Sequence, residues 1–134
     1  MPKKNYFSLS NGFSLIELMV VVAILSVAAA IAVPKFLKYQ VERRQEECHQ
    51  NLRSLLETER NYFKKTNLFT SDVSALGWEP KGRKWHTYHF IPNPPPKNGF
   101  LFECLGNIDK DPTIDQATID ETGQINQISD DVKK

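Results

Sequence analysis

The chain has 134 residues, of which 40% are hydrophobic and 25% charged, and its formal net charge is +1 at pH 7. This length allows one folded domain together with a membrane anchor, but not two domains. Because positive and negative charges nearly balance and no basic run dominates, the composition gives no argument for nucleic-acid binding.

Residues 1–12 (MPKKNYFSLSNG) form a short polar segment with two lysines near its start, Lys3 and Lys4. Positive residues placed before an apolar segment hold that end of a protein in the cytoplasm. We therefore interpret residues 1–12 as a cytoplasmic leader.

An apolar segment follows, from Gly12 to Pro34 (GFSLIELMVVVAILSVAAAIAVP), with no charge between Leu18 and Val33. Counted from Phe13, it has about 21 residues, and a helix of that length rises far enough to cross a hydrocarbon core about 30 Å thick. The segment is therefore predicted to be a transmembrane helix.

Glu17 interrupts this apolar segment near its start. An ionised carboxylate at that depth is costly unless another group neutralises it, and the segment contains no basic residue. If the chain were cut between Gly12 and Phe13, the new α-amine of one copy could neutralise Glu17 of another copy.

The run GFSLIE (residues 12–17), with an apolar segment that ends in PKF (residues 34–36), resembles the processing and assembly segment of type IV pilins and type II secretion pseudopilins. The resemblance is close from Gly12 to about Phe36 and loose beyond. It implies that a prepilin peptidase cleaves after Gly12 and methylates the new N-terminal Phe13. It also implies that Glu17 assists subunit docking and that Pro34 bends the helix.

The same resemblance implies a structural subunit of a type IV pilus, not an enzyme, which serves motility, adhesion or surface attachment. Such a subunit is a single-pass precursor in the inner membrane. An assembly platform and its ATPase then add it to an extracellular filament of identical copies. No nucleic-acid partner is expected unless the filament takes up DNA.

Several alternatives stay open. In the same superfamily, the chain could be a pseudopilin of a type II secretion system or a minor or DNA-uptake pilin. In another class, it could be a membrane-anchored enzyme or binding domain. A secretory signal peptide cleaved near Ala28–Ala32 and a plain single-pass anchor are weaker interpretations, because both leave Glu17 unexplained.

Helical periodicity continues after Pro34 to about Lys65. Apolar residues fall mostly three or four apart and so lie along one stripe of a helix; they are Leu37, Val41, Cys48, Leu52, Leu55, Leu56 and Phe63. We predict one helix over residues 13–65, with a membrane and assembly part (13–34) and an amphipathic part (35–65). Because proline lacks the N–H donor, a kink or local opening is expected at Pro34.

Residues 66–134 are predicted to form a loop and a small antiparallel sheet. Turn-forming residues mark a loop over 66–83, and strands are expected at 84–91 and 99–105, followed by a hairpin of 113–120 and 124–128. The final residues, 129–134, are expected to be loose. The run LGWEP (residues 76–80) resembles the loop of short deltaproteobacterial type IV pilins. The expected fold class is α+β, with the long N-terminal helix packed on the C-terminal sheet as in pilins.

The chain has two cysteines, Cys48 and Cys104. In an exported domain a single disulfide is the simplest outcome, with two buried free thiols as the alternative. The two-residue period of a strand places Phe100, Phe102 and Cys104 on one face. If that face packs on the helix, Cys104 approaches Cys48.

The run GNIDKDPTID (residues 106–115) places oxygen side chains at the spacing of a calcium loop, from Asn107, Asp109, Asp111 and Asp115. Pro112 replaces the usual glycine of such loops, and Thr118 replaces the bidentate glutamate. A structural turn is therefore the favoured interpretation, with calcium as a hypothesis and no other cofactor expected.

His49, His86 and His89 do not have the spacing of a metal site, and His86 and His89 fall on opposite faces of a strand. We expect ordinary surface or half-buried histidines. The sequence contains no recognisable catalytic motif, so no catalytic residue is predicted.

Overall fold

The computed structural model describes residues 12–82, 85–91 and 99–132. The leader up to residue 11, Lys84 in the first predicted strand and the proline-rich run 92–98 lie outside the described residues. The chain divides into two units between Phe36 and Leu37, and each is described by itself.

The first unit consists of the beginning of helix α1, which extends from Leu15 to Thr66. Its first helical hydrogen bond runs from Leu18 N to Ser14 O at 3.1 Å, and all side chains from residue 12 to residue 36 are exposed. The helix predicted at 13–65 is thus confirmed to within two residues. Pro34 lies inside α1, and the bend there stays a prediction.

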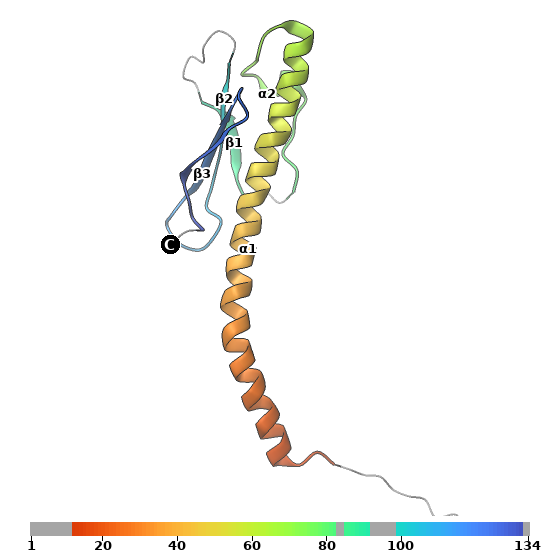
Figure 1. The fold of residues 1–134 in the computed structure, drawn as a ribbon, viewed down its shortest axis with the longest axis vertical. Helices are drawn as coiled ribbons and strands as arrows, with labels where there is room; N and C mark the ends of the chain where they lie inside the picture. Colours follow the sequence, from red (N-terminus) through yellow and green to blue (C-terminus); the bar gives the residue numbers. More distant parts are fainter. Residues whose placement is uncertain (1–11, 83–84, 92–98, 133–134) are drawn as a thin grey trace, which may run out of the picture. The chain divides into compact units, whose positions relative to one another are not determined.

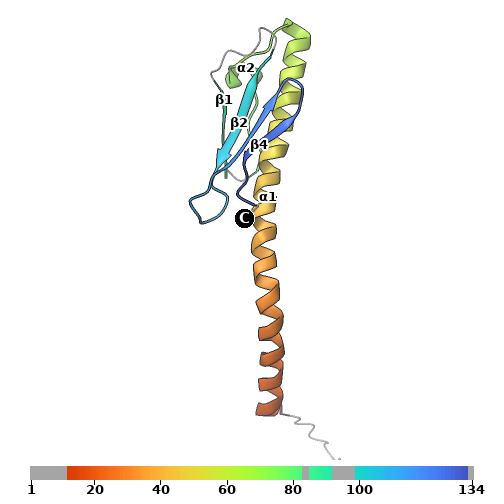
Figure 2. The same cartoon turned by 60° about the vertical axis from the view of Figure 1, so that its left-hand side comes forward.

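The second unit combines the rest of α1 with a four-stranded sheet. The strands are β1 (Thr87–Phe90), β2 (Leu101–Gly106), β3 (Asp115–Asp120) and β4 (Ile125–Ser129). They pair antiparallel in the order β1-β2-β3-β4, and the sheet lies alongside the C-terminal half of α1 (Figures 1 and 2). The predicted α+β fold is confirmed.

Residues that lie opposite one another on neighbouring strands form the layers of the core. Cys104 lies opposite Tyr88 and Ala117, while Phe102 lies opposite Phe90 and Ile119. Because side chains alternate along a strand, these residues share the face of the sheet that packs on α1. The buried core of the second unit comprises Cys48, Leu52, Leu55, Leu56, Trp78, Phe100, Phe102, Cys104, Ala117 and Ile119.

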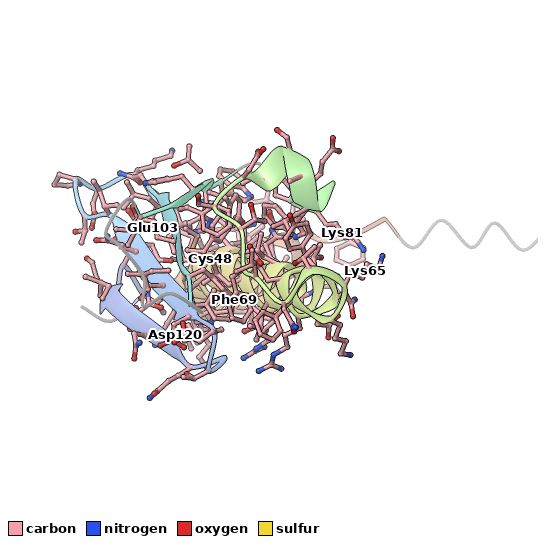
Figure 3. All side chains as sticks on the ribbon, turned by 90° about the horizontal axis from the view of Figure 1, so that it is seen from above. Cys48, Lys65, Phe69, Lys81, Glu103 and Asp120 are labelled. Carbon is pink, nitrogen blue, oxygen red and sulfur yellow. A yellow bond between two sulfur atoms is a disulfide. The ribbon has the colours of Figure 1, made fainter. Side chains whose placement is uncertain are left out.

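A disulfide joins Cys48 of α1 to Cys104 of β2, with Cα atoms 6.2 Å apart. Both side chains are completely buried, and Cys48 lies where the helix meets the sheet (Figure 3). The predicted pairing is confirmed, and the alternative of two free thiols is wrong.

The connection between α1 and β1 differs from the predicted loop because it contains one helical turn, α2 (Val73–Leu76). The Asp72 carboxylate accepts a hydrogen bond from Ser74 N at 2.9 Å, and Gly77 ends the turn with φ of +59°. A capping side chain and a left-handed glycine thus form a short helix inside a sequence rich in turn residues.

The apolar stripe of α1 is only partly buried. Leu37 is 56% exposed, whereas Asn51 and Glu59 are buried beside Cys48 and Leu52. Leu37 lies on the predicted stripe but stays exposed, because the first buried residue of α1 is Cys48. The two buried polar residues have specific backbone partners, described below.

Candidate functional site

The exposed apolar surface of the first unit is the most unusual feature of the described residues. Among them α1 is the helix long and apolar enough to cross a membrane by length and composition, and its most apolar 18-residue window has mean hydropathy 2.7 with no residue buried. A continuous apolar surface of this size in water marks a site of contact with lipid or protein. The segment therefore needs a membrane or other helices around it.

Gly12 and Phe13 precede the helix. Both residues are exposed in non-helical backbone, and a Cβ added at Gly12 would meet no atom within 4 Å. The fold of the chain therefore does not require glycine at this position. The peptide bond between Gly12 and Phe13 lies in a segment that a peptidase can reach.

Glu17 has a partner that our sequence analysis missed. Its Oε2 accepts a hydrogen bond from the backbone N–H of Ser14 at 3.4 Å. Ser14 precedes the first helical residue and Glu17 is the third, which is the spacing of a capping box. The bond is long, and within the described ranges no cation lies within ion-pair distance of Glu17. The Glu17 carboxyl group thus caps the start of its own helix.

The four residues predicted as calcium ligands are not brought together. Asp115 begins β3 and is buried, with Oδ1 accepting hydrogen bonds from Gln45 and Gln127. The Asn107 side-chain amide donates to the Asp111 carbonyl. This part of the prediction is corrected, because the loop turns Asp115 into the core of the second unit.

Asp109 and Asp111 instead lie with Asp131, each with a carboxylate oxygen within 4.8 Å of the others. Asp131 is 2% exposed, so the expectation of a loose tail is wrong for Asp131, while residues 133–134 lie outside the described residues. Burial raises the pKa of the Asp131 carboxyl, and the nearby Asp109 carboxylate raises it further. Sequence spacing could not reveal this group, because Asp131 follows the last strand, β4, and only the pairing of β4 with β3 brings it to this loop.

The three histidines have different environments. His49 and His89 match the expectation of surface or half-buried residues, since His49 Nε2 lies 2.9 Å from Gln127 Oε1 and His89 pairs with Glu103. His86 does not, because its side chain is completely buried against Asp115. Strand alternation places His86 on the face of Tyr88 and Phe90 and His89 on the opposite face, and the packing of the first face on α1 buries His86.

Part of the chain is similar to known proteins. Residues 8–33 match the family model of the prokaryotic N-terminal methylation motif. Over 72 residues the chain is 38% identical to the type IV major pilin protein PilA of Myxococcus xanthus (strain DK1622), covering 54% of this chain and 33% of that protein. The chain therefore carries the N-terminal methylation motif, and part of it is similar in sequence to a type IV major pilin.

The chain is also 49% identical over 55 residues to the type IV major fimbrial protein FimA of Dichelobacter nodosus, covering 38% of this chain and 35% of FimA. The match thus spans about a third of the length of these relatives. Within this chain, the methylation motif includes Gly12, Phe13 and Glu17 and ends one residue before Pro34.

Proposed function

We propose that this protein is a pilin, a structural subunit of a type IV pilus, assembled through its apolar N-terminal helix into a filament for motility, adhesion or surface attachment. The observation that carries the proposal is that the methylation motif extends over the beginning of α1, in which every side chain up to residue 36 is exposed. A helix with this surface is stable in lipid before assembly and among sister helices afterwards.

Processing comes first in this scheme. A prepilin peptidase cleaves between Gly12 and Phe13 and methylates the Phe13 amine, while the apolar helix anchors the precursor in the inner membrane. The exposed, non-helical backbone at these two residues supports this step. Since nothing near Gly12 requires a glycine, the glycine serves the peptidase rather than the fold.

Assembly then exchanges lipid for protein around the apolar helices. Lipid is as apolar as the helices, so close packing rather than the hydrophobic effect holds the filament core together. Ala23 and Ala28 support close approach, because with Ile24 and Val27 they line a shallow apolar groove on α1. The inner-membrane assembly platform and its ATPase supply the force that moves the subunit out of the membrane.

Glu17 sets the axial register in this scheme. In a filament its carboxylate meets the Phe13 amine of a neighbouring copy, and this charge-assisted contact is stronger than the long bond to Ser14 N. A subunit displaced along the axis would bury the carboxylate without a cation, which is strongly unfavourable. The contact therefore selects one position of each subunit against the next.

The test is to shear filaments from cells that express the full chain and to weigh the recovered subunit. We expect long fibres whose subunit lacks residues 1–12 and carries one methyl group on Phe13. An unprocessed mass, or a protein found only as a membrane-resident monomer, would contradict the proposal.

A pseudopilin of a type II secretion system is the second candidate, and the Asp109, Asp111 and Asp131 group favours it. Some pseudopilins bind calcium in the corresponding region, and their filament stays in the periplasm. A rise in melting temperature with calcium, together with no fibre outside the cell, would favour this role. Long extracellular fibres without a calcium effect would favour the pilus.

A further inference from the structure

The interior of the second unit brings together two cysteines, a histidine and an aspartate from four separate parts of the chain. Cys48 comes from α1, Cys104 from β2 and Asp115 from the start of β3, while His86 directly precedes β1. The side chains of His86 and Asp115 are completely buried, and so are the two cysteines. One ring nitrogen of His86 lies within 4.8 Å of both sulfur atoms.

One buried nitrogen atom of this cluster has no hydrogen-bond partner among the described residues. His86 Nε2 lies 3.2 Å from Asp115 Oδ2, and Asp115 Oδ1 accepts from Gln45 Nε2 at 2.8 Å and from Gln127 Nε2 at 2.7 Å. His86 Nδ1 is buried and has no hydrogen-bond partner among the described residues. Buried polar atoms in folded proteins nearly always have a partner, so this nitrogen requires an explanation.

We propose that, when the disulfide is reduced, Cys48, Cys104 and His86 Nδ1 bind one zinc ion. Two thiolates and one imidazole are typical protein ligands of zinc. A histidine that binds a metal usually donates its other N–H to a carboxylate, which fixes the ring. Asp115 has that position on Nε2, and the two glutamines hold its other oxygen, so the carboxylate is a positioning residue for the imidazole.

The metal-bound and disulfide states exclude each other. A dithiol reductant reduces the Cys48–Cys104 disulfide and is itself oxidised to a disulfide. The reductant gives two electrons and two protons to the two sulfur atoms, so Cys48 and Cys104 become thiols. Zinc then displaces both thiol protons, giving two zinc–thiolate bonds and two released protons. The Cα separation of 6.2 Å is near the wide end of the disulfide range of about 4.4–6.8 Å. The sulfur atoms can therefore separate around an ion by side-chain rotation.

Zinc in this position would join α1 to β2 before the disulfide does. Each copy passes through a reduced state before its cysteines are oxidised, and a metal bridge between the same two residues would hold the helix and sheet together in that state. The inference concerns the second unit alone. It does not depend on filament assembly.

The first experiment titrates the full chain in detergent with Co²⁺ after complete reduction, without oxygen and with excess reductant removed. We expect one equivalent of Co²⁺ to bind with thiolate-to-cobalt absorption in the near ultraviolet, and Zn²⁺ to displace it. The disulfide-bonded chain should show no such absorption. Failure of the reduced chain to bind, or equal binding by the oxidised chain, would overturn the proposal.

Variants test the individual ligands. Cys48→Ser should abolish the thiolate absorption of a two-sulfur site, and His86→Gln should weaken Co²⁺ binding at least tenfold. Asp115→Asn should weaken it by about 10- to 100-fold, as is typical for the carboxylate partner of a histidine ligand. His89→Gln is the matched control, because His89 is exposed and pairs with Glu103, and its affinity should equal that of the unmodified chain.

A measurement on the unmodified chain covers the case in which a variant does not fold. With ¹¹³Cd²⁺ as the probe, the cadmium chemical shift of the reduced chain reports how many sulfur and nitrogen atoms bind the ion. A shift typical of two thiolates and one imidazole supports the site. A shift without a nitrogen ligand shows that His86 is not involved, and the proposal is then wrong whatever the variants do.

Discussion

Glu59 is completely buried, and its Oε2 accepts a hydrogen bond from the backbone N–H of Thr70 at 3.3 Å. The bond ties α1 to the chain just after the helix ends. Burial raises the pKa of the Glu59 carboxyl to about 7, and the Thr70 bond only partly opposes this rise. Glu59 Oε1 has no hydrogen-bond partner among the described residues.

The stability of the second unit should therefore fall as pH rises. Between about pH 4.5 and pH 7 the folded chain keeps a proton on Glu59 that the unfolded chain loses, so folding is weakened progressively and levels off above pH 7. The expected loss is about 3 kcal/mol in the free energy of unfolding. Urea unfolding followed by tryptophan fluorescence at several pH values measures it.

Replacing the carboxyl by an amide should remove this dependence. Glu59→Gln keeps an acceptor for Thr70 N but cannot ionise, so we expect it to be more stable than the unmodified chain at pH 8 and similar at pH 4. Glu57→Gln, two residues away on the exposed side of α1, is the control and should leave the pH profile unchanged. An identical profile for Glu59→Gln would show that another group causes the effect.

Asn51 fixes the connection between α1 and β1 to the helix. Its amide accepts from Lys81 N at 2.9 Å, donates to Lys81 O at 3.0 Å and donates to Tyr88 Oη at 2.8 Å. Asn51→Ala leaves these groups without partners and should lower the free energy of unfolding by about 2 kcal/mol. Asn61→Ala, at an exposed position of the same helix, should be neutral or slightly stabilising. Equal urea midpoints for the two variants would contradict this role.

The disulfide should contribute strongly to stability. Cys48 and Cys104 are separated by 56 positions, and closing a loop of that length restricts the unfolded chain by about 4 kcal/mol in the chain-entropy model. The double variant Cys48→Ala and Cys104→Ala should unfold at a clearly lower urea concentration, measured with a chelator present so that no metal takes part. A midpoint equal to that of the oxidised chain would mean that the core alone holds the helix to the sheet.

Glu17→Gln tests whether charge sets the register of the filament. The amide can still accept from Ser14 N, so helix capping persists, but it cannot neutralise the amine of a neighbouring subunit. We expect normal membrane insertion and cleavage with at least a tenfold drop in sheared filament. Glu42→Gln, on the exposed face of the second unit, should assemble normally. Unchanged filament yield from Glu17→Gln would exclude the register mechanism.

Gly12→Val tests the role of the glycine. Because a side chain at this position meets nothing within 4 Å, the variant should fold and insert as before but remain uncleaved. Mass spectrometry of the membrane fraction should detect the whole precursor. Efficient cleavage of Gly12→Val would show that the peptidase does not read this position.

Local sequence patterns were enough for several features. The charge-free run after Glu17 and the three- and four-residue spacing to Lys65 predicted the helix to within two residues, because both signals come from neighbours along the chain. The strands and the Cys48–Cys104 bond were also predicted, since alternation placed Cys104 on the buried face. The S-x-x-E pattern of Ser14 and Glu17 also predicts that Glu17 accepts a hydrogen bond from Ser14 N, but our sequence analysis did not use it.

The sequence by itself determined the apolar anchor, the long helix and the positions of the strands along the chain. The reason is that the spacing of apolar residues and the turn residues between them are local signals that extend over a few residues. Only the tertiary structure decided which polar groups lose contact with water. His86 meets Asp115 across 29 positions, and Asp131 reaches the loop of Asp109 from beyond the last strand. Glu59 lies on a helix face whose burial depends on what packs there. Burial and the pairing of distant groups arise from the whole fold, so no short stretch of sequence encodes them.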